Sequence, residues 1–141
     1  MANPALGELS VGMTAKRSYL FSEDRVRAFA ALVDDHAPVH VDAEFARSQG
    51  FSGCLAHGLF VQAVISGMLG TEIPGGRSVI NSLNMKMHNP VPVGETVAYT
   101  VEVTGLTAAV SAVSLTFVGT VGDHTVISGK ALCSFPASRQ A

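Results

Sequence analysis

The sequence predicts an α+β fold in which a curved antiparallel sheet wraps around one central apolar helix. The run from Gly58 to Leu69 is apolar on nearly every side, which is typical of a helix enclosed by the rest of a fold. Most of the chain after it alternates between apolar and polar residues with the period of half-buried strands. The 141 residues contain no internal repeat and no linker, so we expect one domain over residues 1–141.

Composition and charge exclude several classes of partner. Hydrophobic residues make up 48% of the chain and charged residues only 14%, which favours a buried subunit interface in a homodimer or larger homo-oligomer. The formal net charge is −2 with no basic cluster, so nucleic acid is not expected as a partner. No apolar run is long enough to cross a membrane. Cys54 and Cys133 show no paired spacing and no signal peptide is recognised, which predicts a cytoplasmic protein.

The first half predicts a strand followed by two helices. Thr14 to Phe21 is expected to be the strand, and Ser22 is a good N-cap for the first helix. Pro38 disfavours helix in the residue before it, so this helix should stop near Asp34 or Asp35. Asp42 is expected to cap a short second helix. Apolar residues recur on one predicted buried face of the first helix: Val26, Phe29, Ala30 and Val33.

The second half is expected to continue from the central helix into long strands. Gly70 is the predicted end of that helix. In one strand the alternation is regular, with Val97, Tyr99, Val101 and Val103 separated by smaller or polar residues. The other predicted strands cover Ser78 to His88, Ala109 to Val121 and His124 to Phe135.

Asp35 and His40 are the candidate catalytic residues. A carboxylate and an imidazole held by a rigid loop can bind one water and exchange protons near neutral pH. The spacing Asp-x4-His is not specific, however, and taken alone it favours the other interpretation, in which Asp34 and Asp35 are solvated and His40 is structural. Asp35, His40 and His57 could also converge on a metal ion, but their spacing matches no standard zinc site and we predict none.

Gly58 follows His57 at the predicted start of the central helix. Amides at a helix N-terminus lack intrahelical partners and suit an oxyanion. The alternative is that Gly58 serves only packing at a crowded helix start. His57 is expected to be structural, as a cap for its own helix. Ser66 lies on the apolar helix, so its hydroxyl is expected to need a partner, either the preceding turn or the catalytic loop and acyl group.

These motifs occur in an order that resembles a known family. Asp35 to Asp42, with a proline two positions before the histidine, is followed by His57-Gly58 opening an apolar helix and then by Pro90 to Glu95 between strands. The chain resembles the MaoC-like (R)-specific enoyl-CoA hydratases, which have the hot dog fold, from about Leu9 to Phe135. Two departures lie inside the first motif: Ala37 stands where the family usually has asparagine, and His36 where it often has a bulky apolar residue.

The resemblance implies a hydro-lyase that adds water to trans-2-enoyl thioesters or removes it from (R)-3-hydroxyacyl thioesters. It assigns catalysis to Asp35 and His40, the oxyanion amide to Gly58 and a supporting hydroxyl to Ser66. CoA or an acyl carrier protein would enter only as part of the substrate, with no other cofactor. Two other functions remain open: a hot dog acyl-thioesterase, and a non-catalytic acyl-thioester-binding subunit.

Overall fold

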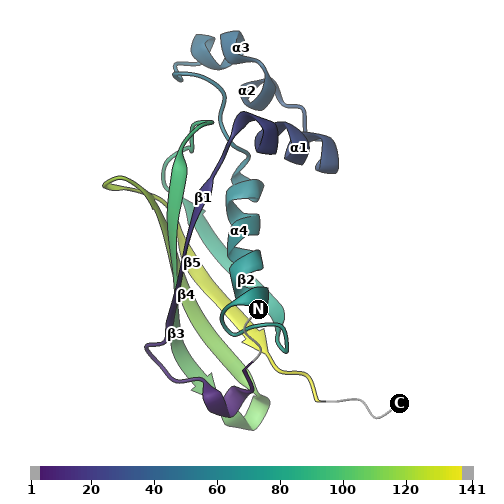
Figure 1. The fold of residues 1–141 in the computed structure, drawn as a ribbon, viewed down its shortest axis with the longest axis vertical. Coiled ribbons are helices and arrows are strands. Elements are labelled where there is room, and N and C mark those ends of the chain that lie inside the picture. The colour runs from purple at the N-terminus through teal and green to yellow at the C-terminus, as the bar shows by residue number, and fades with distance from the viewer. Residues whose placement is uncertain (1–3, 138–141) are drawn as a thin grey trace.

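Five antiparallel strands form one sheet, and the longest helix lies against one of its faces (Figure 1). A computed structural model describes residues 4–137. The strands follow the spatial order β1-β3-β4-β5-β2, and the long helix is α4, Gly58–Thr71. The strand bounds are β1 Thr14–Leu20, β2 Val79–Met87, β3 Thr96–Thr107, β4 Ala112–Val121 and β5 His124–Ser134. The predicted α+β arrangement of a curved sheet around one central helix is therefore observed.

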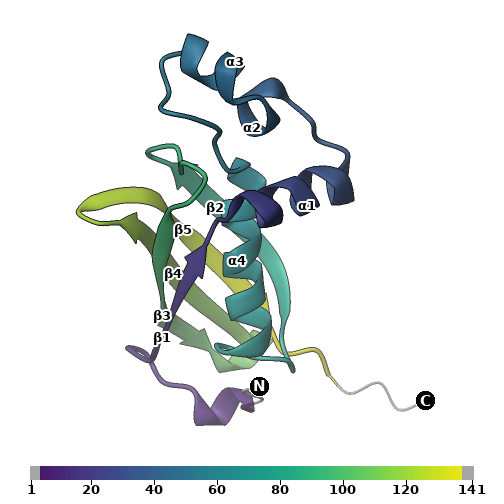
Figure 2. The same ribbon diagram turned by 45° about the horizontal axis from the view of Figure 1, so that its top comes forward.

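Three short helices lie beyond one end of the sheet, above the N-terminus of α4 (Figures 1 and 2). They are α1, Glu23–Val33; α2, Pro38–Val41; and α3, Ala43–Ser48. Two single 3₁₀ turns, η1 (Leu6–Glu8) and η2 (Ala108–Val110), lie toward the opposite end. None of the helices in residues 4–137 is long and apolar enough to cross a membrane.

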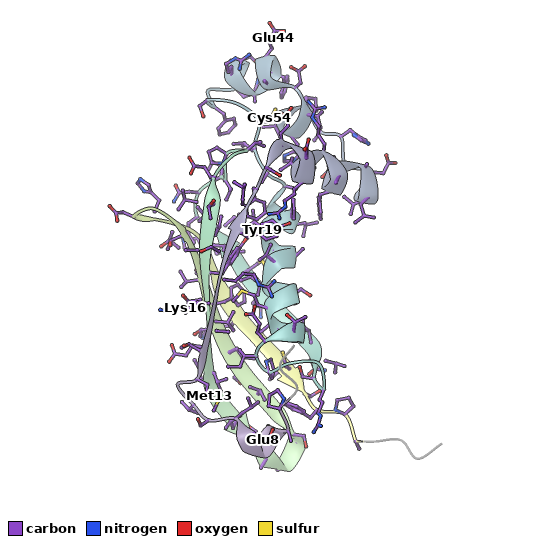
Figure 3. The ribbon with its side chains drawn as sticks, viewed as in Figure 1. Glu8, Met13, Lys16, Tyr19, Glu44 and Cys54 are labelled. Atoms are coloured by element: carbon purple, nitrogen blue, oxygen red, sulfur yellow. The ribbon has the colours of Figure 1, made fainter. Side chains whose placement is uncertain are left out.

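The inner face of the sheet supplies the core against α4. The four alternating residues predicted for β3 are all buried, and so are Val113, Leu115 and Phe117 of β4. Tyr99 donates its hydroxyl to the carbonyl of Val61 in α4 at 2.8 Å, so its polar end is satisfied inside the core. Lys16 on β1 points away from the helix (Figure 3).

Glycines in β4 and β5 allow the close contacts of the curved sheet. A Cβ atom at Gly129 would lie 2.1 Å from the carbonyl oxygen of Asn84, and one at Gly119 would lie 2.8 Å from Ile127. No side chain fits at either distance. Glycine is therefore required where these strands and side chains approach one another most closely.

Helix α4 is buried on one side only. Its inward residues are Phe60, Val61, Val64, Ile65, Met68 and Leu69. Leu59, Ala63 and Ser66 are exposed on the other side, so within the single chain the sheet covers only part of the helix. An apolar pattern shows that cover is needed but does not show that the same chain supplies it.

Two predicted boundaries and one predicted buried residue need correction. Helix α4 continues past Gly70 to Thr71, and Arg17 bonds the side chains of Thr71 and Glu72 at this end. Val33 at the end of α1 is 49% exposed and does not belong to the buried face. The strand expected from Ala109 begins only at Ala112, after η2.

Candidate active site

The segment between α1 and α3 brings an acid and an imidazole together through backbone geometry. Helix α1 ends at Val33, and its C-cap Asp34 adopts the left-handed conformation with φ 57°. Ala37 is extended (φ −54°, ψ 133°), and Pro38 then opens α2. The predicted helix end is confirmed. His40 lies in a one-turn helix rather than in a loop, because proline suits the first position of a helix.

The carboxylate of Asp35 is oriented by its own turn. The amide of Ala37 donates to Asp35 Oδ1 at 3.2 Å, as in an Asx-turn. This is the only hydrogen bond that the Asp35 side chain makes to the described residues. The second oxygen is therefore available to a water or substrate.

The ring of His40 has a defined tautomer. Nδ1 lies 2.8 Å from the carbonyl oxygen of Leu55. A carbonyl oxygen can only accept, so Nδ1 carries the hydrogen and the neutral ring keeps a lone pair on Nε2. The amide of Leu55 donates in turn to the carbonyl of Val39 at 3.0 Å, which fixes the two segments to each other.

His57 is buried next to both candidate catalytic residues. Its side chain is 2% exposed, and its Nε2 donates to the backbone carbonyl of Asp35 at 3.0 Å. Its ring stacks on that of His40, with centroids 3.9 Å apart and planes at 25°. The other nitrogen, Nδ1, has no hydrogen-bond partner among the described residues. The side chain does not cap α4, so that prediction is wrong.

Asp35, His40 and His57 do converge, with one possible ligand atom of each within 4.8 Å of the others. The stacking disfavours chelation, however. Imidazole lone pairs lie in the ring plane, and zinc sits about 2.0–2.1 Å from a histidine nitrogen. Two nearly parallel rings whose centroids are 3.9 Å apart cannot both direct a lone pair at one ion. The geometry therefore favours proton chemistry over metal binding.

Gly58 lines a pocket together with His40. The pocket has a volume of about 370 Å³ and is also lined by the segment from Met87 to Val91. The amide of Gly58, the first residue of α4, has no acceptor among the described residues. A Cβ atom here would meet only Met87, at an ordinary 3.9 Å, and the backbone is not left-handed. Neither crowding nor backbone conformation requires glycine, so the packing interpretation is not supported.

A second pocket meets His40 from another side. It has a volume of about 220 Å³, and Val26, Arg27 and Cys54 are among its lining residues. Cys54 lies among the short helices at the top of the molecule (Figure 3). His40 thus forms part of two cavities, whereas His57 lines neither.

Ser66 does not join this site. It follows Gly58 by eight residues, or about 12 Å along the helix axis. It is exposed rather than buried, and its hydroxyl makes no hydrogen bond to the described residues, so the expectation that burial imposes a partner is wrong. The structure therefore separates Ser66 from the other predicted site residues.

His88 is a site residue that the sequence did not indicate. It lines the pocket of His40 and Gly58, and its Nε2 lies 2.6 Å from the hydroxyl of Ser128. The two residues are 40 positions apart, so no local pattern marks the pair. His36 stays outside, with its nearest charged partner being Asp34 at 3.6 Å.

The sequence model of the MaoC-like domain family matches residues 7–124. The chain belongs to this family. The recognition made from the motifs is thereby confirmed.

Relatives in the family include an (R)-specific enoyl-CoA hydratase of Rhodospirillum rubrum, 34% identical over 92% of this chain and 90% of that protein. A 3-hydroxybutyryl-CoA dehydratase of Methylorubrum extorquens is 34% identical over 95% of this chain and 85% of its own length. The solved (R)-hydratase from A. caviae has a TM-score of 0.87 and 34% identity, covering 92% of this chain and 98% of that one. These likenesses confirm the hot dog fold and agree with the predicted hydro-lyase class.

Proposed function

We propose that this protein adds water to trans-2-enoyl thioesters, forming (R)-3-hydroxyacyl thioesters, and catalyses the reverse dehydration. The names of the relatives support this reaction class. The observation that carries it within this chain is that Asp35 lies close to His40, and that His40 and Gly58, whose amide is free, line one accessible pocket. An acid, a base and an oxyanion donor are the groups that such an addition requires.

The water lies between the carboxylate of Asp35 and Nε2 of His40. The pair removes one proton as the water oxygen bonds to C3 of the enoyl group. The pair then returns a proton to C2, so the enzyme regains its starting protonation state. Because Nδ1 of His40 is committed to the Leu55 carbonyl, Nε2 is the nitrogen that takes part.

Negative charge develops on the thioester oxygen while the C3–O bond forms. The amide of Gly58 stabilises this charge, since it is unpaired and lies at the positive end of the α4 dipole. A donor of this type is commonly worth about 3–4 kcal/mol in the transition state. The missing Cβ leaves space for the thioester to approach.

The substitution of Ala37 for the usual asparagine is compatible with this scheme. The hydrogen bond that orients Asp35 comes from the backbone amide of residue 37, which any residue except proline provides. The other departure, His36, lies outside the pocket. The geometry of Asp35 and His40 therefore gives no support to the interpretation that the protein is a non-catalytic binding subunit.

The acyl group is carried on CoA or on an acyl carrier protein, and the scheme requires no other cofactor. Cys54 and Cys133 are unpaired, which is consistent with a cytoplasmic location.

A homodimer would cover the exposed side of α4. Leu59 is 69% exposed there, and the free edge of the sheet at β2 carries exposed Val79, Ile80 and Met87. An uncovered strand edge beside apolar side chains is a surface that a second copy can bury. Sedimentation at micromolar concentration should give a dimer, and a stable monomer would contradict this assembly.

The test is hydration of crotonyl-CoA, followed by loss of the enoyl absorbance and by chiral analysis of the product. Asp35→Asn should lower kcat by about 10²–10⁴-fold, the usual contribution of a general acid or base. Asp34→Asn is the matched control, because the Asp34 side chain is 96% exposed and asparagine tolerates the left-handed conformation. Release of free thiol without hydration would instead indicate a thioesterase. No reaction with CoA-bound or carrier-bound enoyl thioesters of any length would overturn the proposal.

A further inference from the structure

A series of aromatic rings connects the core to the catalytic imidazole. Phe60 at the start of α4 stacks on Phe29 of α1, with centroids 4.8 Å apart and planes at 3°. The ring of Phe29 lies 5.0 Å from that of His57, which stacks on His40 at 3.9 Å. His40 is thus held on one face by a ring that is itself packed against the core.

We propose that His57 is a positioning residue that holds both members of the catalytic pair at once. Its ring face supports the ring of His40, and its Nε2–H bonds the backbone carbonyl of Asp35. The proposal rests on the function assigned above to Asp35 and His40. It gives His57 a role in turnover without contact to the substrate.

The chemistry at His57 distinguishes this role from simple packing. A buried polar atom without a partner is unfavourable, and Nδ1 of His57 is such an atom. Phenylalanine would fill a similar space without that cost, but it could not donate to the carbonyl of Asp35. A straight-chain amide could donate there but could not stack on His40. Histidine performs both tasks with one side chain.

The position of His57 predicts which kinetic constant it affects. It is almost fully buried and lines neither of the pockets that His40 borders. Its loss should therefore leave substrate binding nearly unchanged. The placement of the two reacting groups should suffer instead, and errors of about 1 Å can lower rates about 100-fold.

Three variants separate the two contacts. His57→Phe keeps the stack and removes the donor, whereas His57→Gln keeps a donor and removes the stack. We expect each to lower kcat about 10-fold, and His57→Ala about 100-fold, with KM changed less than about 2-fold. Val103→Ala, a cavity-forming change in β3 away from the site, serves as the control for lost stability, and its kcat should stay at the wild-type value.

A double substitution tests whether His57 acts through the pair. In an Asp35→Asn, His40→Ala background, His57→Ala should cause no further loss of kcat, because the groups it positions are gone. The ¹⁵N signals of the His40 ring should shift in His57→Gln, a readout that does not depend on activity. Inactive wild-type protein would refute the proposed reaction, whereas active wild type with unimpaired His57 variants would refute only the positioning role. A multiplicative loss in the double background would also refute that role.

Discussion

The sheet with α4 and the segment of short helices above it are built on different principles. In the sheet, burial dominates: it raises the pKa of the Cys133 thiol to about 11 and also raises the pKa of the Tyr99 phenol, so both groups stay neutral. In α1, α2 and α3 only Val26, Ala30 and Ala46 are buried. There the fold depends on caps, turns and side-chain bonds to carbonyls.

This difference explains why reactive groups collect in the upper segment. Burial penalises charge, so a core that excludes water suppresses acid and base chemistry. Backbone hydrogen bonds can hold Asp35 and His40 in place while their functional atoms remain accessible. Substitutions in the two regions should therefore affect different quantities, stability in the first and turnover in the second.

The largest effect is expected in the sheet. Leu115→Ala removes a buried side chain from β4 and should lower the free energy of unfolding by about 2–5 kcal/mol, with little change in kcat of the folded protein. Chemical denaturation measures the first quantity and the crotonyl-CoA assay the second. The neighbouring Ser114→Ala, on the exposed face, should stay within about 0.5 kcal/mol. A large loss of kcat in Leu115→Ala would contradict the view that substitutions in the sheet affect stability and not turnover.

Gly58→Ala should show the opposite behaviour. The added methyl group meets only Met87 in the free protein, so stability should be kept, but it obstructs the approach of the thioester to the amide. We expect kcat/KM to fall about 100-fold. Gly70→Ala is the matched control in the same helix, with open space around its Cβ, and should retain full activity. Equal activity of the two variants would argue against an oxyanion role for residue 58.

The smallest effect concerns Ala37, the N-cap of α2. Alanine is a poor N-cap, and the side chain at this position makes no capping bond. Ala37→Asn should raise the free energy of unfolding by about 0.5–2 kcal/mol without reducing kcat. Thermal unfolding measures the gain. A drop in kcat would show that the turn after Asp35 needs the freedom that alanine leaves.

The features predicted correctly from the sequence are those with local causes. Ser22 and Asp42 cap helices as expected, because capping joins residues three positions apart. The buried face of β3 follows from strict alternation. The family motif singled out Asp35, His40 and Gly58, whose spacing alone left other interpretations open. The structure brings Asp35 close to His40, and His40 and Gly58 line one pocket, while their catalytic roles stay a prediction.

The features that were missed depend on contacts between distant residues. The bond from His57 to the carbonyl of Asp35 spans 22 positions and involves a backbone atom that any residue supplies. No sequence pattern can mark such a bond. The exposure of Ser66 was missed for a related reason, since periodicity reports the polarity of a helix and not which chain covers it.

The contact between His40 and the carbonyl of Leu55 affects when, during synthesis of the chain, the imidazole can reach its final position. Residues 54–56 are themselves held by the segment before β3, through Ala56 to Val91 at 2.8 Å and Val93 to Cys54 at 2.9 Å. The imidazole of His40 therefore receives its final orientation only after a segment some fifty residues further along has left the ribosome and docked. A nascent chain can form α1 and its caps early, because those contacts are local, but it becomes an enzyme late.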